Sequence, residues 1–292
     1  MGAFLGRPRP IRADGKVVLI TGCSKGGIGY ALAEEYARRG AKVYATARRL
    51  EAMDGLQEQG VTILKLDVTN EDDIQGAIDV IITEAGRIDV LVNNAAVFAT
   101  RPVADTPLSD WRTLFETNLL GAVAMARAVF PHMAERKEGL VINVSSCAGY
   151  CHLPMAAAYS ASKAALNAAT NCMRMEMKPF GVKVMLVVPG FIKTNIHSNE
   201  QHKRQPLPSN SLYKSCEGRL NHIADWALTQ FIGTTAEEFA KCTVDAAVQS
   251  PPPWRFFMGA GWRQAMYGLW LLPTSIVDSE LWKPYQACLE GP

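Results

Sequence analysis

The sequence of 292 residues lacks a long hydrophobic run. A helix that crosses a membrane needs roughly 18 or more apolar residues in succession, and no such stretch occurs. The opening residues, MGAFLGRPRPIRADGK, hold no apolar run long enough for a signal peptide. The Met-Gly start also lacks the Ser or Thr that a myristoylation signal requires. These absences predict a cytoplasmic protein without a membrane-spanning segment.

Cysteine pairs and histidine pairs at metal-binding spacing are lacking too. The seven cysteines include no CxxC pair, and the five histidines have no HxxxH spacing. Scattered cysteines in an odd number favour a reduced intracellular setting over a disulfide framework, and no metal site is expected. The formal net charge of +2 gives no indication of a nucleic-acid partner.

Short apolar segments alternate with segments of helical periodicity. Strands are expected at 17–21, 42–47, 61–66, 88–92, 139–144 and 182–188, and helices at 28–39, 71–85, 109–134 and 156–178. Because most of the strands are apolar throughout, both faces of the sheet need a cover, which is typical of a parallel sheet. The pattern predicts an α/β fold of the Rossmann type, doubly wound, with helices on both faces.

The pattern changes after Pro189. Residues 195–235 are polar with weak periodicity, and we interpret them as a mobile lid. A helix is expected at 236–249 and a last edge strand at 254–258. The apolar and aromatic segment 261–273 is too short to cross a bilayer, so we interpret it as a core helix, with contact to a membrane or a partner as the alternative.

The chain as a whole, residues 1–292, is expected to form one domain. Its parts are a cofactor-binding and catalytic core at 15–190, a substrate lid at 191–250, and a last strand with the apolar C-terminal segment at 251–292.

A glycine-rich turn, TGCSKGGIG at residues 21–29, lies between the first expected strand and the first helix. Backbone N–H groups at such a turn and the dipole of the following helix can bind a pyrophosphate. Glycine is needed because a Cβ would hold the backbone away from the phosphate. The turn therefore predicts a dinucleotide site that includes Gly22, Ser24, Lys25, Gly27, Ile28 and Gly29.

The end of the second strand bears on the choice of nucleotide. An acidic side chain there would bind the adenosine ribose and repel a 2′-phosphate, but no carboxylate occurs before Glu51. Arg48 instead offers a planar fork suited to a phosphate, and Lys25 adds a second cation. The residues favour NADP(H) over NAD; the alternative is that Arg48 and Arg49 are solvated surface arginines.

Tyr159 and Lys163 are four residues apart on an expected helix, which places them on one face. A nearby cation favours a phenolate, so we expect Lys163 to lower the pKa of Tyr159 and make it a usable acid/base. Ser146 ends the fifth strand and could hold a substrate oxygen. Asn118, in the long preceding helix, could position Lys163 through a water. A YxxxK pair alone is common by chance, but its conjunction with the glycine-rich turn indicates a catalytic site.

Together these residues resemble the short-chain dehydrogenase/reductase family over roughly residues 15–260. The matching pieces are TGCSKGGIG at 21–29, Asp67-Val68, Asn93-Asn94-Ala95-Ala96, Asn118, Ser145-Ser146, Tyr159 to Lys163, and Pro189-Gly190 followed by Thr194. The resemblance implies a seven-stranded parallel sheet in the order 3-2-1-4-5-6-7. It also implies pairing of subunits through the helices at 109–134 and 156–178, so a homodimer or homotetramer is expected.

The resemblance implies roles for these residues as well. The cofactor set gains Asp67 and Val68 at the adenine, Asn94 and Ala95 along the cofactor, Pro189 and Gly190 after the sixth strand, and Ile192 and Thr194 at the nicotinamide carboxamide. Tyr159 would be the acid/base, Ser146 the oxyanion partner, and Lys163 the ribose ligand that tunes Tyr159.

Two departures from the family pattern occur. The glycine turn has one residue more than the common TGxxxGxG spacing, so either Gly26 or Gly27 could be the glycine of close contact. The usual NNAG is NNAA here, which should narrow the space slightly.

The residues say less about the substrate. The first βαβ unit resembles the fungal NADPH-dependent 1-acyldihydroxyacetone-phosphate reductases, and related fungal secondary-metabolism ketoreductases look much the same. The expected pocket wall is apolar and aromatic: Val97, Phe98, Cys147, His152, Phe191 and Ile192. Cationic residues in the lid, including Lys203 and Arg204, could steer a phosphate or carboxylate, or they are simply solvated.

The function predicted is that of an NADPH-dependent carbonyl reductase acting on an apolar small-molecule ketone. An alcohol dehydrogenase working in the oxidative direction, and a protein that keeps the fold for a non-redox or ligand-binding role, remain as alternatives. Peripheral contact of residues 261–273 with the endoplasmic reticulum or lipid droplets is compatible with either class.

Overall fold

The computed structural model describes residues 13–196, 204–229, 233–262 and 271–289. At its centre is a seven-stranded parallel sheet in the order β3-β2-β1-β4-β5-β6-β9. The strands are β1 (Val17–Thr21), β2 (Lys42–Ala47), β3 (Thr62–Lys65), β4 (Val90–Asn93), β5 (Gly139–Val144), β6 (Val182–Pro189) and β9 (Arg255–Met258). The predicted order and the predicted edge strand are confirmed.

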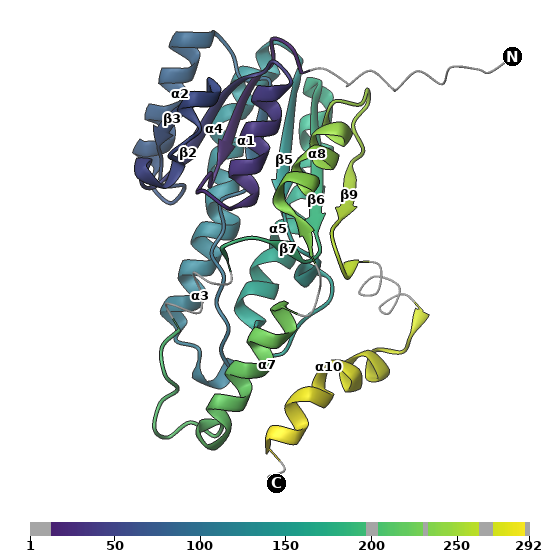
Figure 1. Ribbon diagram of the computed structural model, residues 1–292. Coiled ribbons are helices and arrows are strands. Elements are labelled where there is room, and N and C mark those ends of the chain that lie inside the picture. The colour runs from purple at the N-terminus through teal and green to yellow at the C-terminus, as the bar shows by residue number, and fades with distance from the viewer. Residues whose placement is uncertain (1–12, 197–203, 230–232, 263–270, 290–292) are drawn as a thin grey trace, which may run out of the picture.

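Helices cover both faces of the sheet (Figure 1). One face carries α1 (Ile28–Arg38) and α8 (Ala236–Ala247), and the other carries α2 (Glu71–Ala85), α4 (Gly121–Glu135) and α5 (Ala157–Met177). Side chains of a strand alternate between the two layers. In β1, Val18 and Ile20 join the core under α1 and α8, while Val17 and Leu19 join the other core. The doubly wound fold is thus confirmed.

Local sequence signals account for where α2 begins and ends. The Asn70 side chain accepts hydrogen bonds from the N–H groups of Asp72 and Asp73, as an N-cap does. Gly86 ends the helix in the left-handed conformation, with φ of 72°. The helix predicted over 71–85 is therefore confirmed, with the same first and last residues.

The long helix expected over 109–134 is divided. It consists of α3 (Leu108–Phe115), a π-helical turn (Glu116–Leu120) and α4. A wider turn of this kind is often found at functional sites, and here it contains Asn118. Side-chain periodicity does not reveal such a turn, because the apolar spacing continues across it.

The lid region carries more structure than its polar sequence indicated. It contains two paired strands of two residues, β7 (Ile192–Lys193) and β8 (Thr234–Thr235), and the helix α7 (Glu217–Thr229). The C-terminal helix α10 (Thr274–Leu289) packs against α7 in the lower part of Figure 1. A third apolar cluster joins them, formed by Leu207, Cys216, Leu220 and Tyr285.

The segment 261–273 lies mostly outside the described residues. Of the part that is described, Leu271 is 75% exposed and Leu272 46% exposed, so these two are not core residues. Within the described parts of the chain, no helix combines the length and the apolar character that a membrane crossing requires.

Candidate active site

The glycine-rich turn joins β1 to α1 at the carboxyl edge of the sheet. Gly22 has a φ of 74°, and a Cβ on it would lie 2.7 Å from the Cα of Ala95. A Cβ on Gly29 would lie 2.5 Å from the Nδ2 of Asn94. Helix α1 begins after Gly27 without a side-chain cap, so its first N–H groups are available to an anionic ligand. The turn has the features of a cradle for a pyrophosphate.

The structure distinguishes Gly26 from Gly27. Gly27 is the N-cap of α1, with ordinary extended backbone. Gly26 has a φ of 76°, and a Cβ on it would lie 3.0 Å from the Cγ of Asn195 and closer still to the Nδ2. Of the two, Gly26 is therefore the position at which the turn requires glycine. A side chain there would be strained by the positive φ and would collide with Asn195.

The ends of β1 and β4 are joined by Thr21 and Asn94. The Thr21 hydroxyl accepts hydrogen bonds from the N–H groups of Asn94 and Ala95, both at 3.0 Å. The Nδ2 of Asn94 donates to the carbonyl oxygens of Thr21 and Gly22, at 2.9 and 3.1 Å. These bonds fix Asn94 and Ala95 beside the turn.

Two cations lie at the same edge of the sheet. Arg48 directly follows β2, and the N–H of Lys25 donates to the carbonyl of Ala52 at 2.8 Å, which joins the turn to the segment after β2. Both side chains are exposed. Neither forms an ion pair with any residue in the described ranges, so both are free to bind a phosphate.

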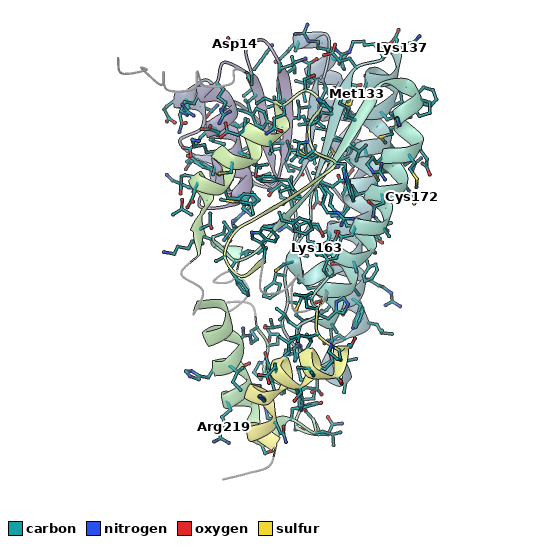
Figure 2. The ribbon with its side chains drawn as sticks, turned by 90° about the vertical axis from the view of Figure 1, so that its right-hand side faces the viewer. Asp14, Met133, Lys137, Lys163, Cys172 and Arg219 are labelled. Carbon is teal, nitrogen blue, oxygen red and sulfur yellow. The ribbon has the colours of Figure 1, made fainter. Side chains whose placement is uncertain are left out.

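The predicted catalytic residues meet below the carboxyl end of β5. Lys163, which Figure 2 labels, is 2% exposed, and its Nζ donates to the carbonyl of Val144 at 3.0 Å. The same Nζ lies 5.9 Å from the ring centre of Tyr159. The Ser146 hydroxyl accepts from the N–H of Ala148 at 3.1 Å and lies close enough to the Tyr159 phenol to lower its pKa. One site thus contains a phenol, a hydroxyl and a buried amine.

Asn118 connects this site to the loop after β4. Its Oδ1 accepts from the N–H of Val97 at 2.8 Å, and its Nδ2 donates to the carbonyl of Val97 and to the hydroxyl of Ser162, both at 3.0 Å. Ser162 directly precedes Lys163 on α5. Asn118 therefore holds the helix turn that carries Lys163, and a water-mediated contact between the two stays a prediction.

A small cavity of about 100 Å³ lies beside Phe98 and Ala158, which are neighbours of Tyr159. It is lined by Phe98, Ala99, Thr100, Arg101, Thr106, Asp110, Leu114, Met155, Ala158, Arg204 and Gln205. The Phe98 ring meets the Tyr159 ring edge-on, with centres 4.8 Å apart. Of the pocket wall expected from the sequence, Phe98 alone lines this cavity.

A family model described as short chain dehydrogenase matches residues 16–205. The chain belongs to the short-chain dehydrogenase family.

A curated relative and two solved structures extend the comparison. The NADPH-dependent 1-acyldihydroxyacetone phosphate reductase of Schizosaccharomyces pombe is 40% identical over 201 residues, 68% of either chain. The crystal structure of a short-chain dehydrogenase from Streptomyces avermitilis is 30% identical, with a TM-score of 0.76 over 93% of this chain and 98% of that one. A metagenomic short-chain oxidoreductase in complex with NADP is 35% identical, with a TM-score of 0.57 over 61% and 83%.

The remaining residues expected from the family pattern of this short-chain dehydrogenase lie along the same edge. Asp67 follows β3 and accepts two hydrogen bonds from Thr69, and Val68 is buried. Pro189 ends β6, and the N–H of Gly190 donates to Met258. The buried Ile192 and the partly buried Thr194 follow.

The pKa values in this short-chain dehydrogenase overturn one expectation. Burial raises the pKa of Tyr159 to about 12, against the opposing effect of the hydrogen bond from Ser146. Burial also lowers the pKa of Lys163 to about 8. The prediction that Lys163 lowers the pKa of Tyr159 was wrong for this structure, because loss of solvent disfavours both charged forms.

Two contacts of the site were missed from the sequence. Asn195 bonds to the glycine-rich turn, and Arg101 donates to the carbonyl oxygens of Gln205 and Pro206, at 2.6 and 3.0 Å. Both contacts join segments that are about a hundred residues or more apart. No local sequence pattern signals a hydrogen bond of this kind.

Proposed function

We propose that this protein is an NADPH-dependent carbonyl reductase in which Tyr159 protonates the oxygen of a ketone. The observation that carries the proposal is that the buried amine of Lys163 lies 5.9 Å from the Tyr159 ring centre, with the Ser146 hydroxyl near the Tyr159 phenol. A phenol and a hydroxyl at one point can both hydrogen-bond to one carbonyl oxygen.

NADP(H) is the cofactor we propose, and when bound its nicotinamide supplies the hydride. The glycine-rich turn would hold the pyrophosphate, Arg48 and Lys25 the 2′-phosphate, and Lys163 the nicotinamide ribose. The names of two similar proteins support this choice, since one is called an NADPH-dependent reductase and the other was solved with NADP.

The pKa values favour the reductive direction. With a pKa of about 12, Tyr159 keeps its proton at neutral pH and can donate it to the oxygen that gains electrons. Lys163, with a pKa of about 8, exchanges a proton near neutral pH and is suited to help restore the Tyr159 proton. An oxidation would instead need the phenolate as base, which burial disfavours.

The substrate we propose is an apolar ketone, with acyl-dihydroxyacetone phosphate and aromatic polyketide ketones as the first classes to assay. The cavity beside Tyr159 offers Phe98, Leu114 and Met155 to an apolar group, and Arg101 and Arg204 on its wall suit a phosphate or carboxylate.

The first experiment is energy transfer from tryptophan to the nicotinamide as NADPH or NADH is titrated, followed by a panel of ketones. Tyr159→Phe should lower turnover about a hundredfold or more while NADPH still binds. Tyr213 packs against the apolar cluster of α7 and α10, so Tyr213→Phe serves as the matched control and should keep its activity. Equal turnover in Tyr159→Phe and wild type would refute the proposed role, and failure of the wild type to bind either nucleotide would favour the non-redox alternative.

We also propose a homodimer or homotetramer that pairs through α4 and α5. Exposed apolar side chains support this pairing, with Leu120 at 47% and Met175 at 59% exposure. Light scattering of the purified protein measures the assembly.

The proposed peripheral contact of residues 261–273 with a membrane or lipid droplet is tested by flotation with liposomes, with and without residues 261–292.

A further inference from the structure

The segment that follows β7 turns back onto the glycine-rich turn. The backbone N–H of Asn195 donates to the carbonyl of Gly26 at 3.3 Å, and the Nδ2 of its side chain donates to the carbonyl of Lys25 at 3.2 Å. One residue therefore bonds to two successive carbonyls of the turn. Thr194, its neighbour, belongs to the residues proposed for the nicotinamide end of the cofactor.

The turn is built to receive this residue. Gly26 has a φ of 76°, and a Cβ at that position would overlap the Asn195 amide. The turn also has one residue more than the common family spacing. The extra residue of the turn and the absence of a side chain at Gly26 together leave room for the Asn195 side chain.

A trans peptide group directs its C=O and its N–H to opposite sides. The C=O of Lys25 and the N–H of Gly26 belong to one peptide group, and this C=O is directed at Asn195. The N–H of Gly26 therefore points away from Asn195, and it bonds to no residue in the described ranges. By holding the carbonyl, Asn195 fixes the direction of a free N–H in the turn proposed for the pyrophosphate.

We propose that Asn195 is a positioning residue for the dinucleotide, which holds the pyrophosphate turn and the nicotinamide-side segment at a fixed separation. The inference rests on the proposed use of NADP(H). It distinguishes ligands by size, because only a ligand that reaches both segments depends on their separation. NADPH is such a ligand. Adenosine 2′-monophosphate, which carries the adenine end and the 2′-phosphate but no phosphate at the 5′ position and no nicotinamide, is not.

The test is the dissociation constant of each ligand for wild type and Asn195→Ala, measured by tryptophan fluorescence or calorimetry. Loss of one side-chain hydrogen bond should weaken NADPH binding about fivefold to tenfold and leave adenosine 2′-monophosphate binding unchanged. Asn195→Asp keeps the shape but removes the donor, so it should bind NADPH at least as weakly as Asn195→Ala. Asn210→Ala, an exposed asparagine elsewhere in the lid, is the matched control and should bind both ligands as the wild type does.

A double-mutant cycle tests the contact itself. Gly26→Ala introduces a Cβ in the left-handed region and against the Asn195 amide. The conformational cost is the same in both backgrounds, so Gly26→Ala should weaken NADPH binding by a smaller factor in Asn195→Ala than in the wild type.

The outcomes separate the two proposals. NADPH binding by Asn195→Ala equal to that of wild type would overturn the positioning role alone, as would an equal loss for both ligands or equal factors in the cycle. A wild type that binds no NADPH would overturn the proposed function together with this inference.

Discussion

Replacement of Lys163 should make the cofactor-free protein more stable. Lys163 is 2% exposed, and within the part of the chain that the structure describes its Nζ has one hydrogen bond, to the carbonyl of Val144. Burial without a carboxylate partner lowers the pKa of this amine from 10.5 to about 8. Lys163→Met keeps the length of the aliphatic chain and removes the group that resists burial.

The magnitude follows from the pKa. Each pH unit of displacement is worth ~1.4 kcal/mol, so the change from 10.5 to about 8 corresponds to roughly 3 kcal/mol of destabilisation at neutral pH. The lost hydrogen bond to Val144 offsets ~1–2 kcal/mol of this. Lys163→Met should therefore raise the free energy of unfolding at pH 7 by about 1–2 kcal/mol, which is ~2–6 °C in Tm.

The pH dependence gives the sign of the effect. Between pH 8 and about 10.5 the unfolded chain holds the Lys163 proton and the folded chain does not, so the wild type gains stability as pH rises through this window. The penalty is complete below pH 8. The advantage of Lys163→Met should accordingly shrink, and then reverse, as pH rises from 8 to 10.

Urea unfolding without cofactor, at pH 7, 8, 9 and 10, measures both quantities. Lys183→Met, which removes an exposed lysine of β6, is the control and should follow the wild type at every pH. A Lys163→Met protein that is less stable than wild type at pH 7, or a difference that does not change with pH, would refute the reasoning.

Two further predictions concern Arg48 and Asp89. Arg48→Ala should raise the KM for NADPH about tenfold to a hundredfold and change that for NADH little, because the proposed guanidinium–phosphate contact is lost. The neighbouring Arg49→Ala should show neither effect in steady-state kinetics. Asp89 is 4% exposed and bonds to the N–H of Val17 and to the guanidinium groups of Arg87 and Arg136. Asp89→Asn should lower the free energy of unfolding at pH 7 by about 3 kcal/mol. Burial alone would raise the pKa of Asp89, but these bonds hold it below its usual value. Its contribution is therefore present above pH ~4 and lost as pH falls through the lowered pKa, so urea unfolding at decreasing pH should show a shallower acid decline in Asp89→Asn than in wild type.

The sequence predicted the sheet well because the strands carry their own signals. The apolar run of β1 and the glycine-rich turn after it together occupy thirteen successive residues, 17–29. The strands β1, β4 and β5 are buried along their whole length, on both faces, so their composition alone indicates their place in a parallel sheet. The Asn70 cap and Gly86 are similarly local. For such elements, sequence and structure give the same answer.

The lid was predicted poorly because its apolar residues pack against a distant segment. Leu220 of α7 and Tyr285 of α10 belong to one cluster, and neither helix has a strong apolar face in sequence. The same reason applies to Asn195 and Gly26, whose contact depends on the return of the chain after β7. The pKa values of Tyr159 and Lys163 were missed for a related reason. Burial in the folded protein raises the first and lowers the second, and the sequence does not show how deeply either side chain is buried.

Buried amides, rather than apolar contacts alone, set the register of α5 against the sheet. The Nδ2 of Asn93 on β4 donates to the Oδ1 of Asn143 on β5 at 2.9 Å, and the Nδ2 of Asn143 donates to the hydroxyl of Thr170 on α5 at 2.9 Å. All three side chains are at most 4% exposed. Apolar side chains can repack after a small shift, but a buried amide without its partner costs ~1–3 kcal/mol. A slide of α5 along the sheet would break this chain of bonds before it moved Tyr159 away from Ser146, so the network that holds the helix also maintains the geometry that the proposed proton transfer needs.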